Sequence, residues 1–176
     1  MSQEQMRGHL YGFYDKLDIR QNAHPEELPP FSGIIELVKG LPSQSIVTSR
    51  PREALDTILG HLKIREHFAY INTRECAKEL HLKDKPAADK LQHVMQQLSV
   101  APGETLMIGD TIMDIGMAKN AGVTAVGVAW GMGTKQDLED AGADYIVTKV
   151  ADLKQLIEAL SKDNTPVPVR ALVCKR

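Results

Sequence analysis

The sequence is poor in the residue types that mark several classes of protein. It has two cysteines without a paired motif, which fits a reducing compartment better than a disulfide framework. Its six histidines form no pair at i and i+4 around a glutamate and have no cysteine companions, so we expect no zinc site. The most apolar stretch, residues 123–130, is far too short to span a bilayer, and residues 1–5 are polar. These absences predict a cytoplasmic protein.

The chain also lacks an excess of basic charge. Its formal net charge is -2 and its pI is about 6.3, so we expect no basic surface that could hold a nucleic acid or an anionic membrane. Hydrophobic residues make up 43% of the 176 positions, which is enough for one domain with a real core. The composition therefore predicts one globular domain with neither nucleic acid nor membrane as a partner.

From Ile34 onward, short β-branched runs alternate with segments of helical periodicity. This pattern is typical of an α/β domain with a mostly parallel sheet. The strands are expected at residues 45–48, 69–71, 105–108, 124–128 and 145–147. The helices are expected at residues 33–39, 52–62, 73–82, 87–98, 113–120, 135–141 and 150–160, with Gly122 as a left-handed cap.

The two ends of the chain differ from this alternating region. Residues 1–17 are helix-like and residues 21–30 are polar and turn-rich, while residues 161–166 form a second polar linker before an apolar tail at 167–174. We therefore divide the chain into a lead-in at 1–30, a core domain at 31–160 and a linker with a short tail at 161–176.

The most specific signal is an apolar strand that ends in Gly109-Asp110, with Asp114 four residues later. Ligands in open α/β sheets bind at the carboxyl ends of the strands. Two carboxylates at that edge suit a hard cation with oxygen ligands, Mg²⁺ above all. The alternative is that Asp110 only ends a strand and Asp114 favours a helix N-terminus through the macrodipole.

Two further polar features follow strands or begin helices. The strand at 45–48 ends in Thr48-Ser49, where a hydroxyl and adjacent backbone N–H groups can bind a phosphate oxygen, although turn formation also explains such a pair. Lys85 stands directly before Pro86, which we expect in the first turn of a helix. A lysine at a helix N-terminus is electrostatically unfavourable, so Lys85 is a candidate to balance phosphate charge, with a solvated lysine as the alternative.

In this order, the three features resemble the second, third and fourth motifs of the haloacid dehalogenase superfamily of Mg²⁺-dependent phosphatases. Thr48, Lys85 and the pair Asp110 and Asp114 stand at the matching positions. The resemblance implies a Rossmann-like three-layer sandwich with a mostly parallel sheet. It also implies a Mg²⁺-dependent phosphatase that acts on a small phosphorylated metabolite.

The resemblance continues downstream of these motifs. Residues 118–123, 126–131 and 141–144 are similar to the corresponding stretch of phosphoglycolate phosphatases and their pyrophosphatase relatives, so the resemblance covers residues 31–160. A dinucleotide-binding domain is disfavoured, because Gly131-Met132-Gly133 lacks the full Gly-x-Gly-x-x-Gly spacing.

The resemblance also implies a role for each site residue. Thr48 and Ser49 would bind phosphoryl oxygens, and Lys85 would neutralise developing charge. Asp110 would hold Mg²⁺, while Asp114 would steady the lysine or a metal-bound water. On this basis Thr48, Lys85 and Asp114 are the candidate catalytic residues, and Asp110 and Asp114 are the candidate metal residues.

The first motif of the family has no counterpart in this sequence. In the family it is an apolar strand that ends in Asp-x-Asp, whose first aspartate attacks phosphorus and whose second acts as acid and base. No Asp-x-Asp occurs here, and Asp15-Lys16-Leu17-Asp18 has the wrong spacing. We therefore interpret residues 1–28 as the last part of a helical cap, and residues 1–30 together as this remnant and its linker, in a truncated or naturally shortened chain. We expect this chain to be inactive and to bind Mg²⁺ weakly, with a non-catalytic phosphate-binding or regulatory protein as the alternative.

The loss of this strand also has a structural consequence. In the family it lies at the centre of the sheet, between the strands that end here at Thr48 and Ile108, so its absence would leave backbone groups unpaired on both. The apolar tail at 167–174 is a candidate to fill that central place. A tail without a fixed place, or one paired on an exposed edge, is the alternative.

Overall fold

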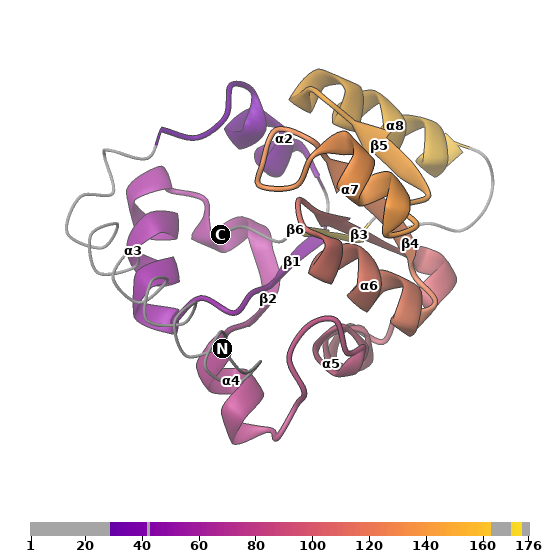
Figure 1. Ribbon diagram of the computed structural model, residues 1–176. Coiled ribbons are helices and arrows are strands. Elements are labelled where there is room, and N and C mark those ends of the chain that lie inside the picture. Colours follow the sequence, from indigo (N-terminus) through magenta and orange to yellow (C-terminus); the bar gives the residue numbers. More distant parts are fainter. Residues whose placement is uncertain (1–28, 42, 163–169, 174–176) are drawn as a thin grey trace, which may run out of the picture.

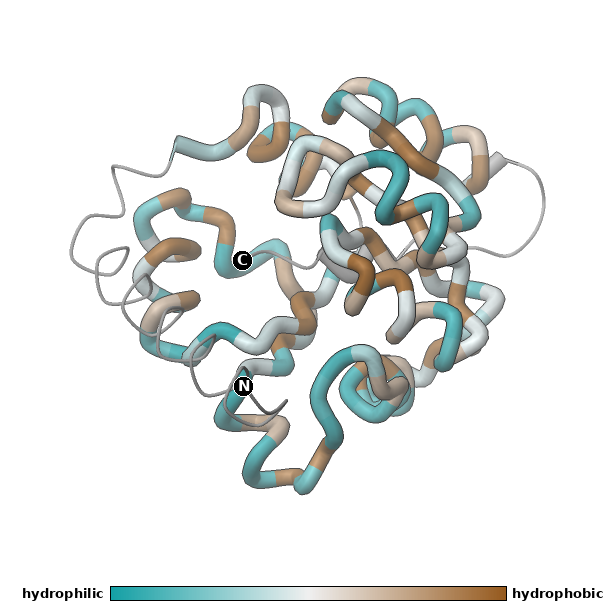
Figure 2. Tube along the Cα trace, viewed as in Figure 1, coloured by the Kyte–Doolittle hydropathy of each residue, from teal (hydrophilic) through white to brown (hydrophobic). Residues whose placement is uncertain are grey.

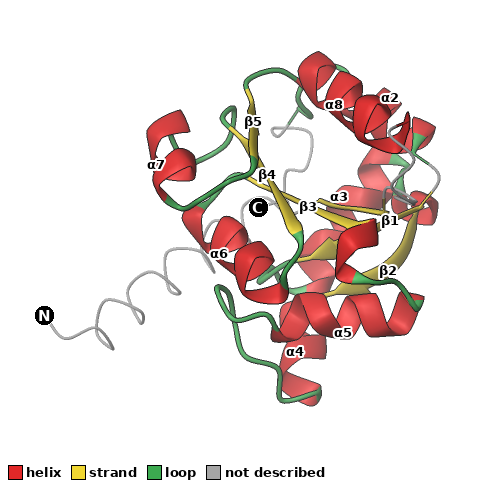
Figure 3. Ribbon diagram, turned by 90° about the vertical axis from the view of Figure 1, so that its right-hand side faces the viewer, coloured by secondary structure: helices red, strands yellow, loops and turns green. Residues whose placement is uncertain are grey.

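The computed structural model describes residues 29–41, 43–162 and 170–173. In these residues six parallel strands form one sheet with helices on both faces, which confirms the α/β class (Figures 1 and 3). The strands are β1 (Ser43–Val47), β2 (Phe68–Asn72), β3 (Thr105–Gly109), β4 (Thr124–Val128), β5 (Tyr145–Val147) and β6 (Arg170–Val173). The helices are α2 (Ile34–Gly40), α3 (Arg52–Leu62), α4 (Arg74–Glu79), α5 (Asp89–Leu98), α6 (Ile112–Ala121), α7 (Lys135–Asp140) and α8 (Val150–Lys162).

Local sequence patterns explain where most of these elements begin and end. The bounds of α3, β4 and β5 are those that the sequence predicts. Gly122 ends α6 with φ of 70°, as expected for a left-handed cap without a Cβ. At the other end of α6, the hydroxyl of Thr111 accepts a hydrogen bond from the backbone N–H of Asp114, and Thr134 does the same for Asp137 in α7.

The apolar side chains of the strands alternate between two faces of the sheet. Val47 and Met107 pack on the face that α5, α6 and α7 cover, where Leu91 and Ile115 lie fully buried. Their neighbours in the strands pack on the opposite face, beneath α2, α3 and α8. Figure 2 shows the hydrophobic residues along the strands in the interior of the molecule. The sheet therefore lies between two helical layers, as the expected sandwich requires.

The centre of the sheet is occupied by the C-terminal strand. The strand order is β2-β1-β6-β3-β4-β5, so β6 lies between β1 and β3 and is parallel to both. Val173 pairs with Ile46 on one side and with Ile108 on the other. This confirms the prediction that the tail fills the central place of the sheet. The physical reason is that β1 and β3 both need hydrogen-bonding partners for their buried backbone groups.

The core of the structure extends beyond the predicted end of the core domain. α8 continues to Lys162, two residues beyond the predicted end of the core domain, and β6 belongs to the same sheet as the strands of the core. The lead-in interpreted as a cap remnant falls mainly on residues 1–28, which lie outside the described residues. In the part of the chain that the structure describes, no helix is long and apolar enough to cross a membrane.

Candidate functional site

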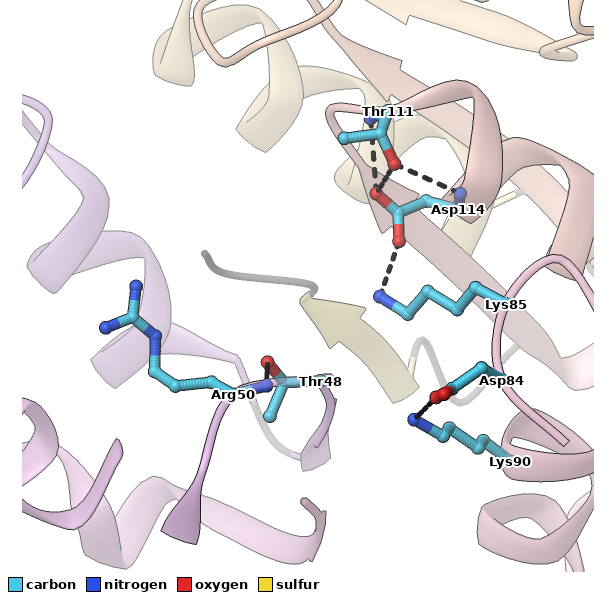
Figure 4. Close-up of polar contacts among 7 residues, drawn as sticks. All are labelled: Thr48, Arg50, Asp84, Lys85, Lys90, Thr111 and Asp114. Atoms are coloured by element: carbon cyan, nitrogen blue, oxygen red, sulfur yellow. Dashed lines mark hydrogen bonds and ion pairs between the residues drawn. The ribbon is translucent and has the colours of Figure 1, made fainter. Parts of the chain in front are cut away.

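The carboxyl ends of the strands bring the predicted site residues to one edge of the sheet. Thr48 follows β1 and Asp110 follows β3, and because all strands are parallel both lie at the same edge as the end of β6. Figure 4 shows Thr48 on one side of β6 and the pair of Lys85 and Asp114 on the other. The structure thus gathers the three sequence features around the end of the central strand.

Lys85 and Asp114 form a buried ion pair. The Lys85 Nζ and Asp114 Oδ1 atoms are 2.6 Å apart, and the side chains are 10% and 2% exposed. The other oxygen, Asp114 Oδ2, accepts hydrogen bonds from the hydroxyl and the backbone N–H of Thr111, at 2.7 and 3.2 Å. Asp114 therefore holds the lysine through one oxygen and the start of α6 through the other (Figure 4).

The loop around Lys85 differs from the sequence prediction. The sequence predicts Pro86 in the first turn of a helix, but α5 begins at Asp89, so Lys85 precedes it by four residues. Pro86 packs against α6 instead: a Cβ on Gly116 would lie 2.9 Å from the Pro86 Cβ, and Asn120 Nδ2 donates to the Pro86 carbonyl at 2.9 Å. Contacts with α6 thus position the lysine, which explains why its partner comes from α6.

Gly109 makes room for the Asp114 side chain. A Cβ at Gly109 would overlap the Asp114 Cβ and lie 2.7 Å from its carboxylate carbon. The glycine that the sequence places before Asp110 is therefore needed for the close approach of α6 to β3, in addition to the tight backbone expected there.

Asp110 is held by a loop that sequence reasoning does not identify as part of the site. The backbone N–H of Met132 donates to Asp110 Oδ2 at 2.8 Å, and the N–H of Gly133 donates to the Asp110 carbonyl at 2.8 Å. A Cβ at Gly131 would overlap the Asp110 carboxylate. The segment Gly131-Met132-Gly133, which resembles part of a dinucleotide-binding motif, thus holds Asp110. Its two glycines are the only feature of the sequence from which this role could have been suspected.

Thr48 is positioned by backbone hydrogen bonds at the end of β1. It is 2% exposed, its N–H donates to the Asn72 carbonyl at 2.9 Å, and its hydroxyl accepts from the N–H of Arg50 at 3.0 Å. Ser49 is exposed at the same edge. The turn that the sequence allows as an alternative is therefore present, and it orients the hydroxyl at the edge where a phosphoryl oxygen could bind.

Two buried polar residues near this edge have no sequence signal. Asn72 ends β2, is fully buried, and neither of its amide atoms has a hydrogen-bond partner within the described residues. Lys90, in the first turn of α5, is fully buried with its ammonium 2.5 Å from the carboxylate of Asp84. These two buried polar side chains show that the interior near this edge is partly polar. The hydrophobic periodicity of the sequence does not predict this.

The described residues fit a single-carboxylate cation site better than a closed metal centre. Among them, no group of three or more His, Cys, Asp or Glu side chains could hold a metal ion. Mg²⁺ in proteins often relies on one or two carboxylates plus substrate phosphate. Asp110, whose Oδ2 is held by the N–H of Met132, fits that role, whereas both oxygens of Asp114 are engaged by Thr111 and Lys85. The geometry favours Asp114 as the partner of the lysine over a metal ligand.

Comparisons with known proteins match this fold and sequence. The family model described as haloacid dehalogenase-like hydrolase matches residues 2–128. The pyrophosphatase PpaX of Bacillus mycoides is 29% identical over 142 residues, which cover 78% of this chain and 64% of the relative. The chain thus spans somewhat less than two thirds of the length of that curated relative.

Solved structures agree with this match. A protein described as a predicted phosphatase from Clostridium acetobutylicum has 29% identity and a TM-score of 0.64, covering 73% of this chain and 60% of its own. A candidate phosphoglycolate phosphatase from Lactobacillus plantarum has a TM-score of 0.73 at 23% identity, covering 89% of this chain and 77% of its own, and supports the fold.

Proposed function

Since the chain belongs to the haloacid dehalogenase-like hydrolase family, we propose that its carboxyl-edge site is the phosphoryl-binding and Mg²⁺-binding part of a phosphomonoester hydrolase. The observation that carries this proposal is the buried pair of Lys85 and Asp114 beside Asp110. A buried ion pair is weak evidence for stability, because desolvation offsets its attraction. Its place at the ligand-binding edge therefore supports a role in binding.

Each residue of the site has a chemical task in this proposal. The Thr48 hydroxyl and nearby backbone N–H groups bind phosphoryl oxygens, and the Lys85 ammonium balances their charge. Asp114 and Thr111 hold the lysine in place. Asp110, cradled by the N–H groups of Met132 and Gly133, would hold Mg²⁺, which as a Lewis acid polarises a phosphoryl oxygen when bound.

The substrate class in this proposal is a small phosphorylated metabolite. A curated relative is named as a pyrophosphatase and a similar structure as a candidate phosphoglycolate phosphatase, so both pyrophosphate and phosphoglycolate-like monoesters belong in a test panel. The alternative is a protein that binds phosphate without turnover, and the absence of Asp-x-Asp from the sequence favours it for this chain alone.

We predict that the purified 176-residue chain releases little phosphate from this panel. Loss of a covalent nucleophile costs roughly 10⁴ to 10⁶ in rate, or roughly 5 to 8 kcal/mol of transition-state stabilisation. Phosphate release should be measured with and without Mg²⁺. A turnover number within tenfold of about 1 s⁻¹, the low end of ordinary enzymes, would show that another residue of this chain acts as the nucleophile.

We also predict weak Mg²⁺ binding that depends on Asp110. Titration calorimetry on the parent chain should give a measurable affinity, and Asp110→Asn should abolish it, because one carboxylate supplies the protein ligand. Asp137→Asn is the matched control, since this carboxylate is tied to Thr134 at the start of α7. Equal affinities for the parent chain and Asp110→Asn would show that Asp110 does not bind Mg²⁺. The metal-binding part of the proposal would then be wrong.

A further inference from the structure

The loop that carries Lys85 is held by a second ion pair with a buried lysine. Lys90, in the first turn of α5, is fully buried, and its Nζ lies 2.5 Å from Oδ1 of Asp84, the residue directly before Lys85. Figure 4 shows Asp84 and Lys90 next to Lys85, on the same side of β6. The two ion pairs thus join this loop to different helices, because Lys90 belongs to α5 and Asp114 to α6.

Two further hydrogen bonds fasten the loop near α5. The N–H of Lys83 donates to Oδ2 of Asp89 at 3.2 Å, and the N–H of Ala87 donates to the carbonyl of Asp84 at 3.0 Å. α5 itself packs on β1 and β2 through buried core residues. Asp84 is therefore held by its side chain and by its carbonyl, and both contacts limit where the next residue, Lys85, can lie.

A gain in stability does not explain the burial of a lysine at position 90. A cation in the first turn of a helix is unfavourable because of the helix macrodipole, and desolvation of a buried ammonium offsets its attraction to a partner. The Asp84 side chain is 53% exposed, so water screens this pair more than a fully buried one. An apolar side chain of similar length would fill the same space without these costs. What the ion pair adds is a fixed place for Asp84.

We propose that Lys90 is a positioning residue, which acts through Asp84 to hold the Lys85 ammonium where a phosphoryl group binds. This inference rests on the proposed function and adds to it a residue that does not touch the phosphoryl group. A lysine side chain is long and flexible, so its ammonium is placed only if both its backbone and its end are held. The pair of Asp84 and Lys90 holds the backbone, and Asp114 holds the end. The lysine is then already ordered when phosphate binds, which reduces the entropic cost of binding.

The alternative is that the pair of Asp84 and Lys90 only stabilises the start of α5. A double variant of the full chain, Asp84→Ala with Lys90→Met, separates the two ideas. It removes the ion pair, leaves the net charge unchanged and leaves no buried lysine without a partner. We expect its melting temperature to stay close to that of the parent chain, because replacing a buried ion pair by apolar side chains is often neutral.

Titration calorimetry with inorganic phosphate provides the functional measurement. The double variant is expected to bind phosphate at least about tenfold more weakly than the parent chain, which corresponds to the loss of about one hydrogen bond to a charged group. Lys119→Met with Asp144→Asn is the matched control. It removes an ion pair of 2.7 Å between α6 and the residue before β5, again without a change in net charge. We expect the control to bind phosphate as tightly as the parent chain.

A second measurement needs no phosphate. Asp114→Ala leaves the Lys85 ammonium without its carboxylate, and this costs less if the loop is free to turn the lysine toward water. We therefore expect the fall in melting temperature caused by Asp114→Ala to be about half as large in the double variant as in the parent chain. If the pair of Asp84 and Lys90 only stabilises α5, the two effects are additive and the fall is the same in both.

Four results would overturn the proposal. The double variant could bind phosphate as tightly as the parent chain, or the control could lose as much affinity as the double variant. Asp114→Ala could cost the same in both backgrounds. A double variant that no longer folds would show that the pair is needed for the fold itself. Failure of the proposed function is distinguishable, because the parent chain and Lys85→Met would then bind phosphate equally weakly, while the comparison of Asp114→Ala in the two backgrounds would still decide whether Lys90 positions Lys85.

Discussion

Deletion of residues 167–176 is expected to abolish the cooperative unfolding transition of the chain. β6 is hydrogen-bonded on both sides, so its removal leaves backbone groups of β1 and β3 unpaired in the interior, next to the buried residues Ile46 and Met107. Each buried unpaired group costs about 1 to 3 kcal/mol. Several such groups together match the roughly 5 to 15 kcal/mol by which a domain is stable.

Thermal unfolding followed by circular dichroism and by the fluorescence of Trp130 measures this effect. Deletion of residues 174–176 alone is the control, because it leaves β6 intact. We expect the control to melt close to the parent chain and the longer deletion to show no sharp transition. A melting temperature unchanged by the longer deletion would contradict the central place of β6.

Replacement of Asp114 by alanine is expected to destabilise the chain more than replacement of any other single residue of the candidate site. It leaves the Lys85 ammonium buried without its carboxylate partner and removes the acceptor for two hydrogen bonds from Thr111. Removing one partner of a buried pair costs about 3 to 5 kcal/mol. In a domain of this size that corresponds to a fall of roughly 6 to 20 °C in melting temperature.

Asp137→Ala is a matched control for the helix-capping part of this effect. Asp137 has the same position in α7, with hydrogen bonds from the hydroxyl and the backbone N–H of Thr134, but it has no buried lysine. The hydrogen bond from the Thr134 side chain, followed by the one from its backbone, lowers the pKa of Asp137. We expect a much smaller fall in melting temperature for Asp137→Ala. Equal losses for the two variants would mean that the buried pair contributes little.

A double variant separates the ion pair from packing. If Asp114→Ala is destabilising because Lys85 is left charged and buried, then adding Lys85→Met should recover part of the lost stability, since an apolar side chain of similar length needs no partner. Chemical denaturation of the two single variants and the double variant gives the coupling free energy. A coupling free energy near zero would mean that Asp114→Ala destabilises the chain only through the lost hydrogen bonds with Thr111.

The secondary structure was largely predictable because it depends on local patterns. The apolar runs that became β3 and β4, the helix α3 and the left-handed cap at Gly122 all follow from the types of residue within a few positions. Where the prediction was wrong, a contact from elsewhere in the chain decided the outcome. Pro86 packs against Gly116 of α6, and α5 begins only at Asp89.

The site was predictable to a similar extent. Thr48 and Asp110 could be placed at the carboxyl edge because each directly follows a strand, and Asp114 because it lies in the first turn of α6. Lys85 was singled out through an expected helix start at Pro86, whereas the helix begins at Asp89. The loop of Gly131, Met132 and Gly133 that cradles Asp110, and the buried Lys90, could not be identified in this way. Their roles depend on which distant segment lies beside them.

The amino-acid sequence by itself determined the class of the fold, the positions of five strands, and the residues that stand at the carboxyl edge of the sheet. Only the tertiary structure decided that the strand from Arg170 to Val173 lies between β1 and β3. A short apolar run can pair with any unpaired strand edge, and the local pattern is the same in each case. β6 takes the central place because β1 and β3, which are far away in the sequence, have backbone N–H and C=O groups that need hydrogen-bonding partners. The local sequence of β6 alone does not predict this pairing.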